Sequence, residues 1–389
     1  MYSKVKEKFY LIGLSIMLIR ALIENSNLIE LPSTVDLVLI VIPAILLGLK
    51  IIMEKYTIKE YIIILIAGIF CVYTSFLCDY FAITMSYLTL VGIKNINISK
   101  ALKVIAITIG IYLLICFIYF LWFYITDRES LPYYAITDNN TKRFYIFFNN
   151  PNSFAAFTFW SLAIYLYLLR DRKNIIKYII YIIINALVYY FTVSRTTLIL
   201  SIILLCAFFA IEKNWKICNE KLLKFLAKYS FLICAVFSLL SVVGYNIFPS
   251  FFDKIDDLLS RRISLGVIAY EMYGMTFLPK AIEFPLVKWK NKYAANLTLD
   301  NAYIRSTINF GIIYLFIIYW IILKGLKLKN DKYELILIIV MSISALSECY
   351  IFSTYFCFPI LILMSKIFEN NKEEKEVKFI ESGNRWKKY

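Results

Sequence analysis

Long apolar runs separated by short basic segments constrain this chain more than any other feature of its sequence. Hydrophobic residues make up 61% of the 389 positions, and charged residues only 18%. That composition is too apolar for a soluble domain of this length. A helix needs roughly 20 mostly apolar residues to cross a bilayer. The sequence therefore predicts an all-α polytopic integral membrane protein.

The apolar runs predict about 12 transmembrane helices with both termini in the cytoplasm, because basic segments follow the even-numbered runs. The predicted spans are residues 9–29, 33–52, 61–78, 80–93, 102–124, 150–169, 175–193, 196–211, 229–248, 302–323, 334–349 and 351–367. Several of these runs are short, so ten spans with re-entrant segments are the alternative. The N-terminal run lacks a small-residue cleavage site and is expected to be an uncleaved anchor rather than a signal peptide.

The basic residues divide unequally between the two faces that this topology defines. Of the 42 lysines and arginines, 29 lie in predicted cytoplasmic segments and 12 in predicted outer segments, while Arg20 lies within a span, one turn from Glu24. Only 3 of the 29 are arginine, against 6 of the 12. Positive charge outside opposes the usual orientation bias, and arginine suits phosphate because its planar guanidinium forms paired hydrogen bonds. The outer face is therefore the predicted functional face.

Several classes of site are disfavoured by composition. The chain has no histidine, which removes the commonest general base and the commonest transition-metal ligand. Its 8 cysteines include no Cys-x-x-Cys pair, so neither a disulfide framework nor a zinc site is indicated. The net charge of +15 would suggest nucleic acid in a soluble protein. Here it lies in topology-setting loops, so nucleic acid is not an expected partner.

Two outer segments are long enough to be functional loops, about 125–149 and about 249–301. In the second loop Ile255, Leu258, Leu259, Ile263 and Val267 recur at helical spacing. They predict an amphipathic helix over 254–273 that lies on the outer membrane surface. Residues 1–369 form the predicted transmembrane domain, and 370–389 a charged cytoplasmic tail expected to be disordered.

Candidate functional residues gather where the outer loops meet the spans. Each has an ordinary explanation, since interfacial charges snorkel to the headgroups and Asp or Asn caps helices. Those explanations do not account for the presence of arginines at four separate span ends. These arginines favour a pocket for a lipid with a phosphate or pyrophosphate head. The candidates for chemistry are Arg143, Arg195, Arg262 and Asp300, and those for substrate binding are Asn150, Asn152, Arg261, Asn301, Tyr303, Arg305 and Glu348.

An ordered set of short motifs resembles the membrane polymerases that join O-antigen or capsular polysaccharide repeat units, a family related to the O-antigen ligases. The set covers roughly residues 94–325. It comprises Asn150-Pro151-Asn152 at the entry to a span, Ser194-Arg195 at a hairpin top, Arg261-Arg262 in the large outer loop, and Asp300-Asn301-x-Tyr303 followed by Gly311.

The resemblance implies a metal-independent glycosyltransferase in the bacterial cytoplasmic membrane, with no cofactor. Its substrates would be oligosaccharides linked to undecaprenyl pyrophosphate, and a flippase and a chain-length regulator are candidate partners. An acceptor hydroxyl would attack the anomeric carbon of the growing glycan, and the lipid pyrophosphate would leave. Arginines would stabilise the charge on that leaving group. Asp300 is the first candidate for the base and Glu348 the second.

Two other functions stay open. A ligase that transfers finished polymer shares much of this layout, but that family uses a histidine in its large outer loop, and this chain has none. A flippase for the same lipid-linked unit would place charges at mid-span along a central cavity, where this sequence has almost none. Both rank below the polymerase.

Overall fold

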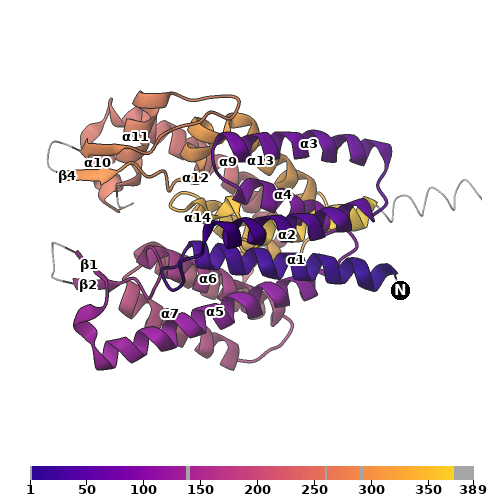
Figure 1. The fold of residues 1–389 in the computed structure, drawn as a ribbon, viewed down its shortest axis with the longest axis horizontal. Coiled ribbons are helices and arrows are strands. Elements are labelled where there is room, and N and C mark those ends of the chain that lie inside the picture. Colours follow the sequence, from indigo (N-terminus) through magenta and orange to yellow (C-terminus); the bar gives the residue numbers. More distant parts are fainter. Residues whose placement is uncertain (1, 137–140, 259–260, 290–292, 372–389) are drawn as a thin grey trace, which may run out of the picture.

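The protein is a bundle of helices with two small outer hairpins (Figure 1). The computed structural model describes residues 2–136, 141–258, 261–289 and 293–371. The described helices are α1 (Tyr2–Glu24), α2 (Ser33–Ile52), α3 (Ile58–Leu77), α4 (Ala82–Gly92), α5 (Ile98–Thr126), α6 (Pro151–Leu168), α7 (Ile176–Thr192), α8 (Arg195–Glu212), α9 (Glu220–Tyr245), α10 (Pro249–Leu258), α11 (Arg262–Tyr273), α12 (Ala302–Arg305), α13 (Ile312–Leu326), α14 (Lys332–Ser344) and a last helix over 359–371.

Short helical turns and two antiparallel hairpins complete the fold. The turns are η1 (Arg128–Ser130), η2 (Lys216–Cys218), the π-helical η3 (Ser306–Phe310) and η4 (Cys349–Phe352). Strands β1 (Tyr133–Ile136) and β2 (Thr141–Phe144) pair in the first outer loop, and β3 (Leu286–Trp289) pairs with β4 (Tyr293–Asn296) in the second. The predicted all-α class holds for the bundle, but the sequence interpretation did not include these hairpins.

The two ends of the bundle differ in what they carry. The N-terminus and the end of the 359–371 helix lie at one end, while both hairpins, α10 and α11 lie at the other (Figure 1). The described parts of the two long loops therefore lie at the same end of the bundle (Figure 1). The predicted tail lies outside the described residues from position 372 onward.

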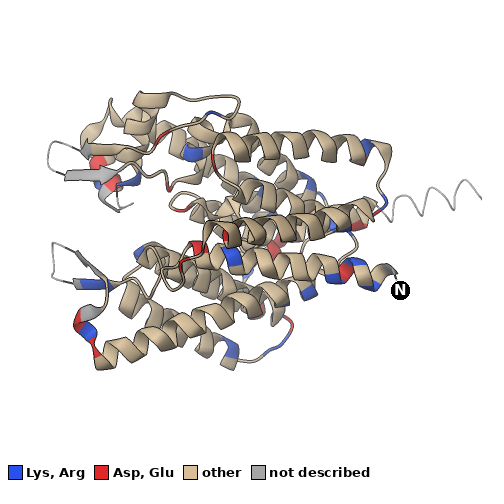
Figure 2. Cartoon of the chain, viewed as in Figure 1, with Lys and Arg blue, Asp and Glu red and all other residues tan. Residues whose placement is uncertain are grey.

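The described helices indicate a protein embedded in a membrane. Five are long and apolar enough to cross a bilayer by length and composition: α2, α3, α5, α8 and α9. Their outward faces carry exposed isoleucines and leucines, such as Leu65 on α3 and Ile118 on α5, which is the surface that lipid favours. Figure 2 shows the long helices largely free of charge along their middles. All twelve predicted spans overlap helical segments, but α4 has only 11 residues and α13 only 15, so the span count stays a prediction.

The predicted amphipathic helix over 254–273 is wrong as a single element. The structure has two helices there, α10 and α11, and Arg261 between them has left-handed backbone, with φ of 65°. The carboxylate of Asp256 accepts hydrogen bonds from the N–H groups of Ile263 (2.7 Å) and Ser264 (3.1 Å). These bonds satisfy the first turn of α11. Helical spacing alone does not reveal a cap that folds back from the preceding helix.

The predicted span 302–323 is interrupted. Residues 302–310 form α12 and η3, Gly311 adopts φ of 85°, and α13 follows. The loop after α11 accepts a hydrogen bond from the backbone at this break: Ile312 N–H donates to the Thr276 carbonyl over 2.9 Å. A Cβ at position 311 would lie 2.5 Å from the Phe277 carbonyl oxygen. Only glycine therefore fits there.

The predicted span 334–349 ends early, at Ser344. The hydroxyl of Ser344 donates to the Met341 carbonyl over 2.8 Å, and that of Ser347 donates to the Ser344 carbonyl over 3.2 Å. Such bonds compete with helix continuation. Glu348 therefore lies in the connection between α14 and the last helix rather than in a span.

Candidate active site

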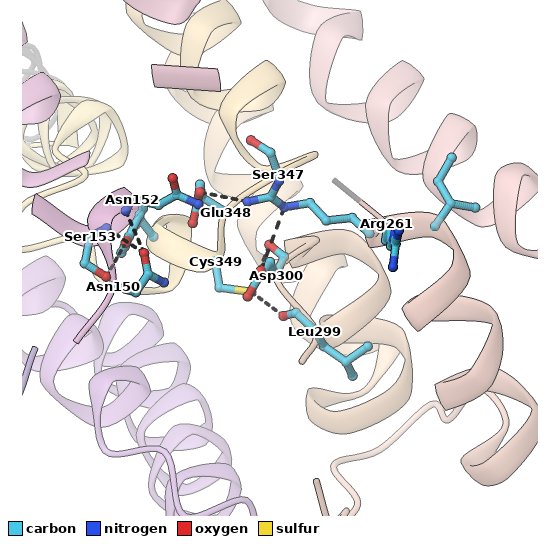
Figure 3. Close-up of polar contacts among 12 residues, drawn as sticks. Asn150, Asn152, Ser153, Arg261, Leu299, Asp300, Ser347, Glu348 and Cys349 are labelled. Atoms are coloured by element: carbon cyan, nitrogen blue, oxygen red, sulfur yellow. Dashed lines mark hydrogen bonds and ion pairs between the residues drawn. The ribbon is translucent and has the colours of Figure 1, made fainter. Parts of the chain in front are cut away.

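A polar site at the end of the bundle that carries the hairpins (Figure 1) centres on Arg262. Its Nη2 donates to Glu348 Oε1 over 3.0 Å, and its Nε lies 3.9 Å from Asp300 Oδ2 (Figure 3). The side chain of Arg262 is only 6% exposed, against 14% for Glu348 and 48% for Asp300. Three candidates from three separate segments therefore meet, as a buried ion pair with a half-exposed carboxylate beside it.

A small second core holds Arg262 in place. Ile263 and Val267 of α11 pack with Val242 of α9 and with Ile304 and Ile308 of the following broken helix. Gly266 allows this close approach, since a Cβ there would lie 2.8 Å from Ile304 Cδ1. Because Arg262 is the first residue of α11, the packing of this helix against its neighbours also fixes the position of the guanidinium.

Glu348 has the electrostatics of a proton acceptor that works near neutral pH. Burial raises its pKa to about 7, and the neighbouring Asp300 carboxylate acts in the same direction. The guanidinium groups of Arg262 and Arg143 oppose that shift. Desolvation prevails because burial removes the water that would otherwise stabilise the charged carboxylate.

Arg143 ties the first outer loop to the top of two helices. Its Nε donates to the Thr192 carbonyl at the end of α7 over 2.9 Å, and its Nη2 donates to Asn152 Oδ1 over 2.7 Å. Asn150 caps α6, accepting from the N–H groups of Asn152 (2.6 Å) and Ser153 (3.2 Å). Asn150 is thus a helix cap, and Asn152 orients Arg143.

The N-terminus of α6 lies beside the segment that carries Glu348. The Tyr350 hydroxyl donates to Ser153 Oγ over 3.3 Å, and Arg143 is close enough to lower the pKa of Glu348. Figure 3 shows Asn150, Asn152 and Ser153 on one side of Glu348, with Asp300 on the other. The two outer loops therefore converge on the turn that follows α14.

Arg195 and Arg261 are both exposed. Arg195 begins α8, and its side chain forms no hydrogen bond or ion pair with any described residue. Arg195 lies three positions after Thr192, whose carbonyl accepts the hydrogen bond from Arg143. Figure 3 shows Arg261 apart from the carboxylates of Asp300 and Glu348. Arg195 is thus available to a ligand beside Arg143, whereas Arg261 does not join the central cluster.

Arg305 lies in an aromatic setting. Its guanidinium carbon is 4.6 Å from the ring centre of Tyr80, 5.4 Å from that of Phe310 and 5.6 Å from that of Phe284. It forms no ion pair with a described carboxylate, and its buried Nε has no hydrogen-bond partner. As expected from the sequence, this charge lies within the apolar region, but aromatic faces rather than an acid surround it.

Asn301 and Tyr303 have hydrogen-bond partners inside the bundle. Asn301 caps α12 through the N–H groups of Tyr303 (3.0 Å) and Ile304 (3.1 Å), and its amide donates to Ser238 Oγ over 2.9 Å. The Tyr303 ring is fully buried, and its hydroxyl donates to the Ser342 carbonyl over 2.8 Å. Both residues hold the broken helix against α9 and α14.

Sequence reasoning missed three residues that shape this region. Asp256 caps α11, and Tyr80 stacks on the Arg305 guanidinium. The Cys349 thiol donates to the carbonyls of Leu299 (2.9 Å) and Asp300 (3.3 Å), so it fixes the carboxylate-bearing turn to the loop. Tyr80 directly follows the turn between the predicted spans 61–78 and 80–93, and that position could have marked it as a candidate. Nothing local marked Asp256 or Cys349.

The arrangement suits the stabilisation of anionic oxygen and the removal of a proton. Within the described residues, no group of three or more cysteine, aspartate or glutamate side chains is placed to hold a metal ion. Guanidinium groups can neutralise phosphate oxygens, and a carboxylate with a near-neutral pKa can accept a proton. The chain matches no protein-family model, no curated protein and no solved structure.

Proposed function

We propose that this protein is a bacterial polymerase that joins lipid-linked oligosaccharide repeat units into capsular or O-antigen polysaccharide. It acts in the cytoplasmic membrane, with both termini in the cytoplasm and the long loops outside. The placement of both hairpins at the end of the bundle opposite the N-terminus supports this orientation (Figure 1). The predominance of lysine in the segments assigned to the cytoplasm supports it as well.

The observation that carries the proposal is the Arg262–Glu348 pair, with Asp300 beside it. A charge pair this deeply buried is weak evidence for stability, because desolvation offsets much of the attraction between the charges. It lies at the functional end of the bundle and combines a cation with a carboxylate whose pKa is about 7. That combination serves a reaction in which a hydroxyl loses a proton while an anion departs.

The reaction joins one sugar hydroxyl to one anomeric carbon. Glu348 takes the proton from the acceptor hydroxyl while the oxygen of that hydroxyl forms a bond to the anomeric carbon of the growing glycan. The bond from that carbon to the pyrophosphate oxygen breaks, and its electron pair leaves with the lipid pyrophosphate. Arg262 stabilises the developing charge together with Arg143 and Arg195. Glu348 replaces Asp300 as first candidate for the base because it is buried and has the near-neutral pKa.

The decisive experiment compares glycans from a strain lacking this gene, with and without the gene restored. Gels of surface glycan and of lipid-linked intermediates would be run side by side. Single repeat units without long chains, reversed on restoration, would support a polymerase. Long polymer retained on its lipid carrier would indicate a ligase, and units confined to the inner leaflet would indicate a flippase. Either of those outcomes would overturn the proposal.

A further inference from the structure

An apolar groove runs along one side of the bundle. It has a volume of about 770 Å³ and lies between α3 and α4 on one wall and α13 and the 359–371 helix on the other. Representative lining residues are Phe70, Leu90, Ile321 and Met364. Figure 1 shows α3 as an outlying helix along one side of the bundle. A groove of this size and lining matches the general character of ligand sites.

The groove extends along about half of the expected membrane thickness. At one end its lining includes Glu60 in the first turn of α3, and at the other it includes Ile83 and Ile313 at the starts of α4 and α13. The α3 residues in the lining run from Glu60 to Cys71, which corresponds to about 17 Å at the usual helical rise. An extended hydrocarbon chain in the groove would therefore cover about half of the bilayer core.

A cation without an acid partner stands beyond the outer end. Tyr314 lines the groove and packs against Phe310 at a ring distance of 5.8 Å. Phe310 stacks on Tyr80 at 5.4 Å, and the Arg305 guanidinium lies over both rings. The buried Nε of Arg305 has no hydrogen-bond partner. A partly buried arginine with a buried, unpartnered Nε is costly unless a ligand completes it.

One short segment connects this groove with the candidate active site. Glu348 at its start binds Arg262, whereas Ile351 and Thr354, a few residues later, line the groove. Arg305 lies next to Cys349, between these two sides. A molecule with its tail in the groove and its head at Arg305 would therefore present the head group to the Glu348 side.

We infer that the groove and Arg305 together bind an isoprenoid lipid with a phosphate or pyrophosphate head, the tail along α3 and α13 and the head at the guanidinium. This inference rests on the proposed function, for which the lipid would be the carrier of the growing glycan. The apolar lining alone would accept any bilayer lipid. Arg305, which forms no ion pair with a described carboxylate and whose Nε has no hydrogen-bond partner among the described residues, selects an anionic head at that level of the membrane.

The test uses the full chain in nanodiscs and a photoactivatable polyprenyl pyrophosphate that bears no sugar. Irradiation followed by peptide mapping should place cross-links in α3, α4, α13 and the 359–371 helix. Unlabelled polyprenyl pyrophosphate should remove them, and polyprenol should compete about tenfold less well, since it lacks the charge-assisted contact. Equal labelling by photoactivatable phosphatidylglycerol, or cross-links outside these helices, would overturn the inference.

Two variants sharpen the result. Ala67→Trp places a large ring in the groove and should reduce labelling strongly, whereas Gly110→Trp on α5, where a side chain would meet open space, should not. Arg305→Gln should weaken labelling about tenfold, and Arg305→Lys should weaken it less. Native labelling in both Ala67→Trp and Arg305→Gln would contradict the site. Because no sugar is present, these results are independent of whether long polymer forms in cells.

Discussion

Arg262 donates from Nη2 to Glu348 Oε1 over 3.0 Å, joining residues 86 positions apart. One belongs to the outer loop and the other to the turn after α14, so the pair fastens the loop to the bundle. It therefore has two separable consequences, one for stability and one for chemistry.

The stability consequence can be isolated with a double variant. Arg262→Ala should destabilise the protein by about 3–5 kcal/mol, because it leaves a buried carboxylate without its partner. Arg262→Ala with Glu348→Gln should recover much of that loss, since the remaining group is neutral. Thermal unfolding in detergent measures both. We expect no long polymer from either, and long chains made by the double variant would exclude a chemical role for the pair.

The Arg195 side chain offers a cleaner test of chemistry, because it is exposed and forms no hydrogen bond or ion pair with a described residue. Arg195→Ala should leave the amount of protein in the membrane unchanged and abolish long polymer. Arg195→Lys should restore it poorly, since an ammonium group lacks the paired geometry of the guanidinium. Gel analysis of surface glycan measures the outcome.

Arg172 provides the matched control for Arg195. It is also exposed, but it lies in a segment predicted to be cytoplasmic. Arg172→Ala should give normal chains. If Arg195→Ala also gives normal chains, Arg195 has no role at the pyrophosphate.

The pKa of Glu348 predicts how activity depends on pH. With a pKa of about 7, the carboxyl is mostly protonated below pH 7 and cannot accept a proton, whereas above pH 7 it is mostly ionised. Polymer formation in membrane vesicles should therefore rise through about pH 7 and then level off. Glu348→Gln should be inactive throughout, and an unchanged pH profile in that variant would transfer the role of base to another group.

Cysteine accessibility tests the orientation of the bundle. In a background without the eight native cysteines, Lys142→Cys and Lys280→Cys should react with an impermeant reagent added to intact cells. Lys213→Cys and Lys329→Cys should react only after lysis. Outside labelling of position 329 would overturn the assignment of sides.

Gly311 should tolerate no side chain. Gly311→Ala forces a backbone region that only glycine occupies readily, at a cost of about 1–3 kcal/mol, and its Cβ would overlap the Phe277 carbonyl. We expect a lower unfolding temperature and less protein in the membrane. Gly110→Ala is the control, because nothing lies within 4 Å of its added Cβ. Equal stability of the two variants would contradict the strained turn.

The sequence by itself determined that the protein is helical and rich in apolar segments that suit a membrane, and it predicted which face carries the site. Apolar runs must be buried in lipid or protein whatever their order, and charge between the runs orients them. It also named Arg262, Asp300 and Glu348 as candidates, because arginines and carboxylates gather where the predicted outer loops meet the spans. These inferences depend only on local composition and spacing.

Only the tertiary structure decided which candidates meet. Helical spacing could not anticipate the break at Arg261, because the cap comes from Asp256 in the preceding helix. It could not show that Asn301 and Tyr303 form hydrogen bonds inside the bundle, because their partners Ser238 and Ser342 are distant in sequence. The pairing of Arg262 with Glu348 likewise follows from how α9, α11 and α14 pack together. Contacts between segments far apart in the chain are set by three-dimensional packing, and no local pattern records them.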